Sequence, residues 1–334
     1  MMKVFISGFG TVGQGVFELL LLKLDLLDSM GGVKVVGIMD SKSYTVDNDK
    51  GVCGLCAIGG KKLSGKVGKV DRNGMEGKDV LDQADYDVLI ECTPTNIEDG
   101  GEGLRNIRHA LEKGKDVITV NKGPLALKFK ELSDLAKKNG CIMRYEGSVG
   151  GAMPIINLCN EALVGQKIRS IKGIFNGTCN FILSRMDSGM PFQQALKEAQ
   201  QLGYAEADPT YDIKGIDSAC KVTILANAVF GRDVTIKDVS ITGIDTITEE
   251  AIALAAENDM VIRLIGEVSD TKLNVSPRLI PKGHPLSLVG TLNMAVVETD
   301  CAGPITVSGR GAGRQETASA ILSDLIAIME ERKR

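Results

Sequence analysis

A glycine-rich segment near the start of the chain lies between a predicted strand and a predicted helix. Residues 3–7 form an apolar run, Gly8-Phe9-Gly10-Thr11-Val12-Gly13 follows it, and a helical pattern continues to about Leu27. In this context the GxGxxG pattern is typical of dinucleotide binding, because the glycines allow a tight turn and let the backbone approach a pyrophosphate. The free N–H groups at the start of the helix attract the same anion. The segment therefore predicts a nucleotide-binding domain.

Strand and helix patterns alternate after this segment. Further strands are predicted over residues 33–39, 87–92, 116–120 and 141–146, and helices over residues 103–113 and 126–138. Repeated βαβ units with short connections indicate an α/β fold, a doubly wound Rossmann-type parallel sheet. Residues 42–76 are rich in glycine and lysine, and their pattern predicts no element. After Pro154 the pattern changes to that of an α+β domain, whose strands we expect to pair into one mixed or antiparallel sheet.

Asp40 directly follows the predicted strand 33–39. An acidic residue at this position usually bonds the adenosine ribose hydroxyls and favours NAD over NADP. Ser41 and Lys42 come next and could instead accommodate a 2′-phosphate. The preference between the two cofactors is left open.

Three other strand ends carry polar residues. The segments are Glu91-Cys92-Thr93-Pro94-Thr95, Thr119-Val120-Asn121-Lys122-Gly123-Pro124 and Glu146-Gly147-Ser148-Val149-Gly150-Gly151. In open α/β sheets, ligands bind at the carboxyl ends of the strands. We therefore expect the three segments to face one shared crevice.

Composition excludes several other classes of protein. The net charge of −4 argues against a nucleic-acid or anionic-membrane partner. The longest apolar runs fall short of the roughly 20 residues that span a bilayer, and the N-terminus lacks the order of a signal peptide. We expect a cytoplasmic protein. The scattered cysteines are typical of reduced core thiols, and Cys53 and Cys56 favour a local disulfide or plain loop residues over a zinc site.

The stretch Gly203–Lys221 combines four carboxylates with a lysine at the start of an apolar helix. Asp217 and Lys221 are four residues apart and share a helix face, as many surface ion pairs do. The chain has only two histidines, and neither lies in a marked segment. Hydride transfer to a carbonyl leaves negative charge on oxygen that a proton or cation must neutralise, so lysine, tyrosine or a metal remains for that role.

These segments together resemble homoserine dehydrogenase in the family's order over nearly the whole chain. The matching segments are GFGTVGQG (8–15), ECTPT (91–95), NKGPLA (121–126), GSVGGAMPI (147–155), NGTCNFIL (176–183), GYAEADPTYDIKGIDSACK (203–221) and GAGRQETASAILSDL (311–325). The resemblance implies reversible NAD(P)H-dependent reduction of L-aspartate 4-semialdehyde to L-homoserine, in threonine, methionine and isoleucine biosynthesis. It implies three parts: a nucleotide-binding domain (1–148), a catalytic and dimerisation domain (149–310), and a C-terminal helix (311–334) that returns to the first. It also implies a homodimer without the regulatory or kinase domains of longer members.

The resemblance also implies roles for individual residues. Lys221 is the general acid, with Lys122 as a second lysine at the hydride-transfer site. The substrate's polar end is held by Glu206, Asp212 and Asp217. The cofactor set comprises Gly8, Phe9, Gly10, Thr11, Val12, Gly13, Asp40, Ser41, Thr93, Lys122, Gly203 and Gly313. A monovalent-cation site for sodium, made largely of backbone carbonyls, comprises Glu146, Val149, Gly151 and Met153.

Two other functions fit parts of the pattern. One is a related amino-acid dehydrogenase with another substrate, which assays on L-homoserine and other amino alcohols distinguish. The other is a non-catalytic dinucleotide-binding sensor. Such proteins commonly lose acid–base residues, whereas both lysines and all the acids are present here.

Overall fold

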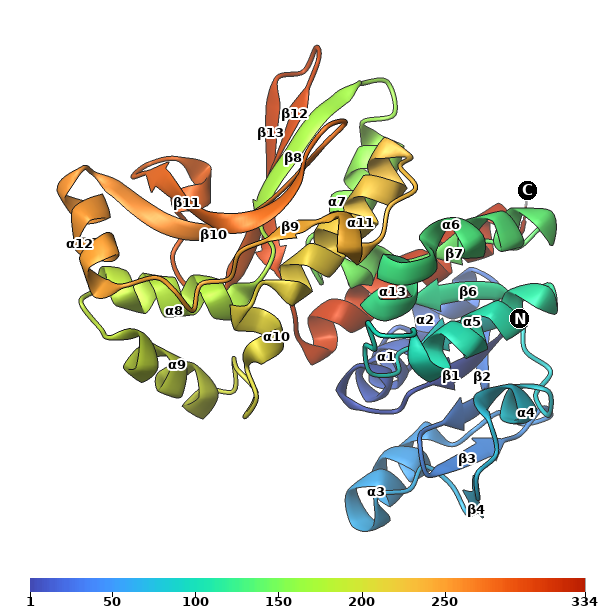
Figure 1. The fold of residues 1–334 in the computed structure, drawn as a ribbon. Helices are drawn as coiled ribbons and strands as arrows, with labels where there is room; N and C mark the ends of the chain where they lie inside the picture. Colours follow the sequence, from blue (N-terminus) through green and yellow to red (C-terminus); the bar gives the residue numbers. More distant parts are fainter. Residues whose placement is uncertain (334) are drawn as a thin grey trace. The chain divides into compact units, whose positions relative to one another are not determined.

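The computed structural model describes residues 1–333, which divide into two compact units (Figure 1). The first unit contains Met1–Ser148 together with the chain from Gly313 onward, and the second contains Val149–Ala312. The first strand and the last helix of the chain therefore belong to the same unit.

A seven-stranded sheet lies at the centre of the first unit, in the order β4-β3-β2-β1-β5-β6-β7. The strands are β1 (Met2–Ser7), β2 (Val33–Met39), β3 (Ser43–Val46), β4 (Val70–Asp71), β5 (Val88–Glu91), β6 (Asp116–Thr119) and β7 (Met143–Arg144). β2, β1, β5, β6 and β7 run parallel, whereas β3 and β4 add an antiparallel edge. The predicted doubly wound sheet is confirmed, and the unassigned region 42–76 supplies its antiparallel edge.

Helices cover both faces of this sheet. They are α1 (Thr11–Leu22), α2 (Leu24–Ser29), α3 (Gly54–Ser64), α4 (Gly77–Leu81), α5 (Gly101–Glu112), α6 (Lys122–Lys138) and α13 (Arg314–Glu331), with the 3₁₀ turn η1 (Glu146–Ser148). Side chains of β1 alternate between two cores: Val4 and Ile6 pack with α1 and α13, and Phe5 packs with α5 and α6. The predicted helix to about Leu27 is interrupted at Lys23, which separates α1 from α2.

The last helix, α13, is fixed against α1. A Cβ on Gly15 would lie 2.6 Å from the Arg314 carbonyl oxygen, so glycine is what lets the two helices approach. The Arg314 guanidinium donates two hydrogen bonds to the Glu18 carboxylate. Ile321 and Leu325 of α13 are buried in the core that α1 shares. The chain from Gly313 onward is therefore part of the first unit's fold.

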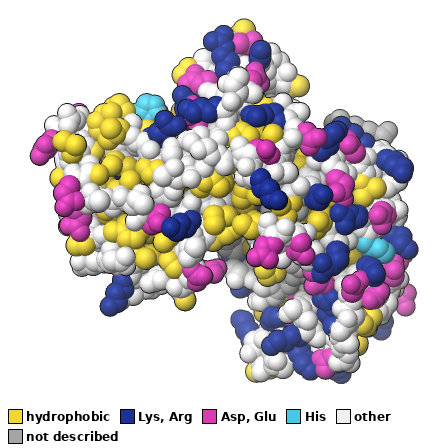
Figure 2. Space-filling view, in the orientation of Figure 1, with side chains coloured by type: hydrophobic (Ala, Val, Ile, Leu, Met, Phe, Trp, Pro, Cys, Tyr) yellow, Lys and Arg dark blue, Asp and Glu magenta, His cyan; other side chains and the backbone are white. Residues whose placement is uncertain are grey.

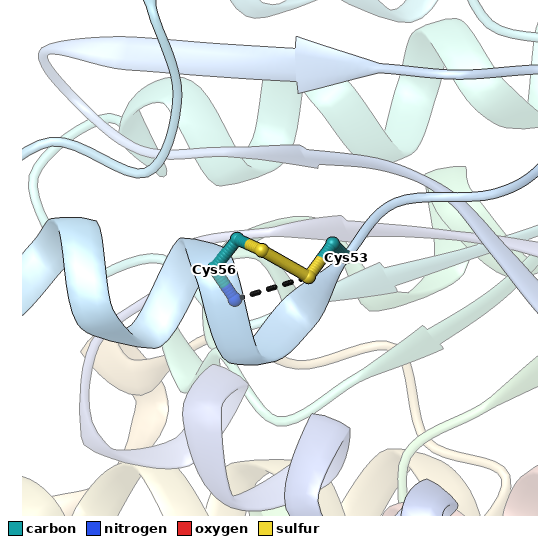
Figure 3. Close-up of a disulfide and its surroundings, with 2 residues drawn as sticks. All are labelled: Cys53 and Cys56. Carbon is teal, nitrogen blue, oxygen red and sulfur yellow. Dashed lines mark hydrogen bonds between the residues drawn. A yellow bond between two sulfur atoms is a disulfide. The ribbon is translucent and has the colours of Figure 1, made fainter.

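The structure joins Cys53 and Cys56 by a disulfide at the start of α3 (Figure 3). Their Cα atoms are 5.2 Å apart, a separation that suits a disulfide. Cys53 is also the N-cap of α3 and its sulfur accepts a hydrogen bond from the Cys56 N–H. Of the alternatives that the sequence left open, the structure contains the local disulfide. Among residues 1–333 no three His, Cys, Asp or Glu side chains are grouped as metal ligands.

The second unit is built on a six-stranded sheet in the order β13-β12-β8-β10-β11-β9. Its strands are β8 (Ile168–Ile174), β9 (Ser240–Ile241), β10 (Met260–Ser269), β11 (Leu273–Pro281), β12 (Leu292–Thr299) and β13 (Pro304–Arg310). All neighbours are antiparallel except β9 and β11, which are parallel. The predicted mixed sheet of an α+β unit is confirmed.

Helical segments connect these strands along the chain and lie beside the sheet (Figure 1). They are α7 (Ile155–Asn157), the π turn η2 (Leu158–Ala162), α8 (Gly177–Asp187), α9 (Phe192–Gln201), α10 (Thr210–Ile213), α11 (Ile216–Phe230), η3 (Ile236–Asp238), α12 (Glu249–Glu257) and η4 (Pro285–Ser287). α11 packs against β10 and β11, and all its residues from Asp217 to Asn227 are buried. Within residues 1–333, the helices lack the combination of length and apolar character that crossing a bilayer requires.

Replacing Ile321 by alanine tests the contribution of α13 to the first unit. Ile321 is almost fully buried, so Ile321→Ala should lower the free energy of unfolding by about 2–5 kcal/mol. The exposed Ser319 lies on the same helix, and Ser319→Ala should change stability by less than about 0.5 kcal/mol. Denaturant unfolding of both variants measures the difference. Equal stabilities would contradict the packing of α13 described above.

Candidate functional site

The three glycines of the first loop have different surroundings. Gly8 has φ +89°, and a Cβ there would lie 2.5 Å from the Cys92 carbonyl carbon. A Cβ on Gly13 would lie 2.1 Å from the Gly8 oxygen, whereas one on Gly10 would meet nothing within 4 Å. Gly8 and Gly13 are therefore required by the turn itself. Gly10 instead leaves open space at the helix start, as a dinucleotide pyrophosphate needs.

The N-terminus of α1 is also suited to an anion. Gly10 is the N-cap, and no side chain in the described part of the chain caps this helix end. Thr11 is exposed and Val12 half-buried, so their N–H groups at the helix start lie near solvent. Phe9 differs from its neighbours, because its side chain is fully buried and packs edge-on against Phe17. Only the backbone of Phe9 is suited to a role in cofactor binding.

Asp40 lies at the end of β2, and its carboxylate is fully engaged. One oxygen accepts hydrogen bonds from the N–H groups of Lys42 and Ser43, both at 2.8 Å, and the other pairs with the Lys61 ammonium of α3. Burial alone would raise the pKa of Asp40, but these hydrogen bonds and the Lys61 charge outweigh it and hold the pKa below its ordinary value. Lys61 was missed in the sequence because it lies in the unassigned region. The carboxylate that usually meets the ribose is thus neutralised by a cation.

A cavity of about 290 Å³ opens beside Asp40. Its lining residues are Ser41, Arg72, Asn73, Gly74, Met75, Glu76, Gly77, Glu102 and Arg105. Arg72 is buried and donates hydrogen bonds to the Asp40 carbonyl oxygen at 3.0 Å and the Met75 carbonyl oxygen at 2.7 Å. The exposed Ser41 therefore borders a polar cavity directly after Asp40, at the end of β2.

A buried network joins the carboxyl ends of β1, β5 and β6. Glu91 accepts hydrogen bonds from the Thr93 N–H and hydroxyl, and the Asn121 amide donates to Thr93 Oγ1 at 3.1 Å. The Asn106 amide of α5 links the Ser7 hydroxyl of β1 to the second Glu91 oxygen. Burial raises the pKa of Glu91, against the effect of these hydrogen bonds. The network fixes Thr93 and Asn121 beside each other at this edge of the sheet.

Lys122 follows directly on this network. It is the first residue of α6, half-buried, and Asn121 caps the helix by accepting a hydrogen bond from the Gly123 N–H at 3.1 Å. The third predicted strand end lies close by, since a Cβ on Gly147 would be 2.8 Å from a methyl carbon of Val120. Within the first unit the three strand ends therefore lie near one another, whereas Val149–Gly151 of the third segment belong to the second unit. The shared crevice stays a prediction.

Gly313 is the remaining cofactor candidate of the first unit. It is exposed, is the N-cap of α13 and has φ +139°. A Cβ there would lie 2.1 Å from Glu316 Oε2. The Glu316 side chain is flexible and can move aside, so it is the backbone angle that favours glycine at this position.

In the second unit, Lys221 lies in a closed polar cluster. Only 7% of Lys221 and 6% of Asp217 is exposed. The Lys221 ammonium donates to Asp217 Oδ2 at 2.7 Å and to the Phe175 carbonyl oxygen at 2.5 Å. Asn293 of β12 donates to the same carbonyl oxygen at 3.1 Å. The interpretation of Asp217 and Lys221 as a solvated surface pair is wrong, because α11 buries that face.

The helix that carries this pair is bounded by glycines. Gly215 precedes it with φ +80° and Gly231 ends it with φ +61°, both in the left-handed region. The apolar run between them is buried, so Asp217 and Lys221 have to satisfy each other inside the unit. The four-residue spacing on the helix and the burial of α11 therefore explain why Asp217 and Lys221 pair with each other.

Asn176 joins a second carboxylate to the cluster. Its amide donates to Asp212 Oδ1 at 2.7 Å and to Asp217 Oδ2 at 2.9 Å. Asn176 lies in the matching segment 176–183, and the sequence predicted no role for it. An asparagine three residues before Cys179 at a helix start is an N-cap signal, and Cys179 N–H does donate to it at 2.8 Å. That signal predicts the N-cap position of Asn176 but not its hydrogen bonds to Asp212 and Asp217.

Glu206 and Gly203 lie in the loop between α9 and α10. Glu206 is exposed, and none of the hydrogen bonds observed in residues 1–333 joins its carboxylate to the Lys221 cluster. Its carbonyl oxygen accepts from the Gln200 amide. Gly203 is exposed with φ +76° and ends the last turn of α9. The structure therefore brings together Asp212, Asp217 and Lys221, but not Glu206.

The predicted cation ligands are divided between the units. Glu146 is buried in the first unit, whereas Val149, Gly151 and Met153 form a tight turn in the second. The Val149 and Met153 side chains are buried and apolar, so only their carbonyl oxygens are suited as ligands. The Met153 oxygen already accepts a hydrogen bond from the Ile155 N–H at 2.8 Å. A carbonyl oxygen has a second lone pair, so the donor chemistry still fits a hard cation.

Two family models match most of the chain. One described as homoserine dehydrogenase matches residues 154–326, and one described as homoserine dehydrogenase, NAD binding domain, matches residues 8–146. Homoserine dehydrogenase of Methanocaldococcus jannaschii is 49% identical over 100% of both chains. NAD(+)-dependent homoserine dehydrogenase of Pseudomonas canavaninivorans is 38% identical over 99% of this chain and 97% of its own.

Solved structures give the same result. The crystal structure of an Archaeoglobus fulgidus relative is similar with a TM-score of 0.90 and 50% identity, over 98% of this chain and 99% of its own. A hyperthermophilic archaeal homoserine dehydrogenase in complex with NADPH has a TM-score of 0.84 and 29% identity, over 97% of this chain and 96% of its own.

Two alanine substitutions test the glycine loop. Gly10→Ala adds a methyl group to open space, so stability should change by less than about 1 kcal/mol while the dissociation constant for a dinucleotide rises at least about tenfold. Gly8→Ala should instead destabilise the first unit by about 1–3 kcal/mol, because it combines a left-handed φ with a backbone clash. Thermal unfolding and cofactor titration separate the two effects. Normal cofactor affinity in Gly10→Ala would contradict the assignment of the loop.

Proposed function

This chain belongs to the homoserine dehydrogenase family, and on that premise we propose that it interconverts L-aspartate 4-semialdehyde and L-homoserine with Lys221 as the general acid. The observation that carries the proposal is the buried cluster in which the Lys221 ammonium contacts Asp217 and the Phe175 carbonyl oxygen. The L-homoserine formed serves threonine, methionine and isoleucine biosynthesis.

The cluster supplies the proton that the reaction needs. NAD(P)H, when bound, supplies a hydride to the aldehyde carbon, and the aldehyde oxygen then requires a proton. Lys221 donates that proton from its ammonium and takes it back when L-homoserine is oxidised. Asp217 and the Phe175 carbonyl oxygen orient the ammonium through their hydrogen bonds. Lys122, at the carboxyl end of β6, serves as the second lysine of the hydride-transfer site.

The acids recognise the substrate's α-ammonium group. Asp212 and Asp217 are held together in the second unit, and complementary charge is what an ammonium group requires. Glu206 completes the set from its exposed loop. Gly203 and Gly313 line the nicotinamide side together with Thr93. These assignments follow the family motifs, and burial of the Asp217–Lys221 pair supports the role given to Asp217.

The remaining features are part of the same proposal. The nucleotide-binding role belongs to residues 1–148, the catalytic and dimerisation role to 149–310, and the C-terminal segment 311–334 belongs with the first of these. Sodium is held by Glu146 and the carbonyl oxygens of the turn 149–153, and the protein acts in the cytoplasm.

A homodimer through the second unit completes this proposal. Figure 2 shows hydrophobic side chains gathered over one face of this unit. Leu254, Leu279 and Val289 are among the exposed apolar residues of the second unit. Apolar surface of this kind supports pairing with a second copy.

The chain binds NAD(P), and the Asp40–Lys61 pair should set the preference between its two forms. Lys61→Ala leaves the Asp40 carboxylate uncompensated, and a 2′-phosphate would then meet an unpaired negative charge. We expect KM for NADP to rise about tenfold more than KM for NAD. Lys62→Ala, the next residue on α3, is the control. Equal effects on both cofactors would exclude this role for Lys61.

Removing Lys221 tests the proposed acid. Lys221→Ala should lower kcat for L-homoserine oxidation at least about 100-fold, the usual size of an acid–base contribution, with cofactor affinity unchanged. Lys214→Ala removes an exposed lysine of the same stretch that pairs with Asp245, and it should turn over like the parent protein. Steady-state kinetics and cofactor titration measure both. Wild-type turnover by Lys221→Ala would refute the mechanism.

A further inference from the structure

The amide of Asn176 contacts both carboxylates of the Lys221 cluster. One N–H donates to Asp212 of α10 and the other to Asp217 of α11, while the oxygen accepts from the Cys179 N–H of α8. Asn176 is itself buried, with 6% of its surface exposed. Three helices therefore meet at a single amide group whose two donors are both used.

The chemistry of an amide suits this position. Two carboxylates that approach the same group repel each other, and a neutral side chain with two N–H donors stabilises both without adding charge. Asp217 Oδ2 accepts from the Asn176 amide at 2.9 Å and from the Lys221 ammonium at 2.7 Å. The direction in which the Asp217 oxygen can meet Lys221 thus depends on Asn176.

We propose that Asn176 is a positioning residue, which holds Asp212 and Asp217 in the geometry that presents the Lys221 ammonium to the substrate. The proposal rests on the role of Lys221 proposed above. Asn176 acts through the carboxylates and needs no contact with the substrate. It gives the second unit a fixed acid pair before any ligand binds.

The titratable side chains around the Asn176 amide come from three helices. Asp212 and Tyr211 lie on α10, Asp217, Cys220 and Lys221 on α11, and Cys179 on α8. The strands contribute the neutral Asn293 of β12, which donates to the Phe175 carbonyl oxygen just after β8. Burial and the neighbouring acids raise the pKa of the Cys179 thiol, and burial, Cys220 and then the acids raise the pKa of the Tyr211 hydroxyl, so both remain neutral. Lys221 is therefore the cation that balances Asp212 and Asp217 among these groups.

Asn176→Asp is the sharpest test, because it keeps the shape and the N-cap oxygen. It replaces two donors by a third carboxylate, which favours the charged form of the nearby ammonium. Oxidation of L-homoserine requires the neutral lysine as base, so the rising limb of the kcat profile should move to higher pH by about one unit. At a pH below that limb, turnover should fall about tenfold.

Asn180→Asp is the matched control on the same helix. Asn180 is also buried, but its amide donates to the carbonyl oxygens of Leu288 and Gly290, away from the acid pair. This variant should lower the melting temperature and leave the pH profile in place. A structural role for Asn176 predicts the same behaviour for both variants. An unshifted profile in Asn176→Asp would overturn the proposal.

Asn176→Ser covers the case in which Asn176→Asp does not fold. Serine keeps an N-cap oxygen, but its shorter side chain has a single O–H donor and cannot hydrogen-bond both carboxylates. KM for L-homoserine should therefore rise about tenfold with KM for NAD(P) unchanged. An unchanged KM for L-homoserine would equally overturn the proposal. Lys221→Ala separates the two hypotheses: normal turnover by that variant rejects the acid itself. Loss of activity there, with parental behaviour of the Asn176 variants, rejects only the positioning role.

Discussion

The ion pair between Asp217 and Lys221 is the interaction on which the proposed chemistry depends. Both side chains are almost completely buried on α11, where an unpaired charge would cost several kcal/mol. The pair is tolerated because each member has further partners: the Phe175 carbonyl oxygen for Lys221 and the Asn176 amide for Asp217. A fully bonded buried charge holds one geometry. A proton donor inside a protein needs that property.

The first unit meets a different requirement, that of a large anionic cofactor. Glycines in its first loop carry no side chain where the backbone comes close to other backbone atoms or must leave space for the cofactor. The N-terminus of α1 has no side-chain cap among the described residues, so its N–H groups suit an anion. The network of Glu91, Thr93 and Asn121 fixes the strand ends from which Lys122 begins α6. Both units therefore use buried polar bonds to hold a few functional groups in place.

Much of this could be predicted from the sequence, because hydrophobic periodicity determines the elements. β2 has the predicted bounds, and the Rossmann loop follows from three glycines in a strand–helix context. Residues 42–76 gave no periodic signal, since β3 and β4 are short strands and α3 is rich in glycine. Partners that depend on tertiary contacts were missed. Lys61 reaches Asp40 from 21 residues away, and Asn176 reaches Asp212 and Asp217 from another helix.

Rebuilding the amine at position 221 tests the central claim most directly. A Lys221→Cys variant should be inactive. Alkylation with 2-bromoethylamine should restore turnover, because it places an amine of lower basicity than lysine at nearly the same position. Because that group loses its proton more readily, the rising limb of the restored profile for L-homoserine oxidation should lie at lower pH than in the parent protein. The parent protein and Lys221→Ala, treated identically, control for reaction at the native cysteines. An active untreated variant, or restored turnover with an unshifted limb, would contradict the assignment of Lys221 as the proton-transfer group.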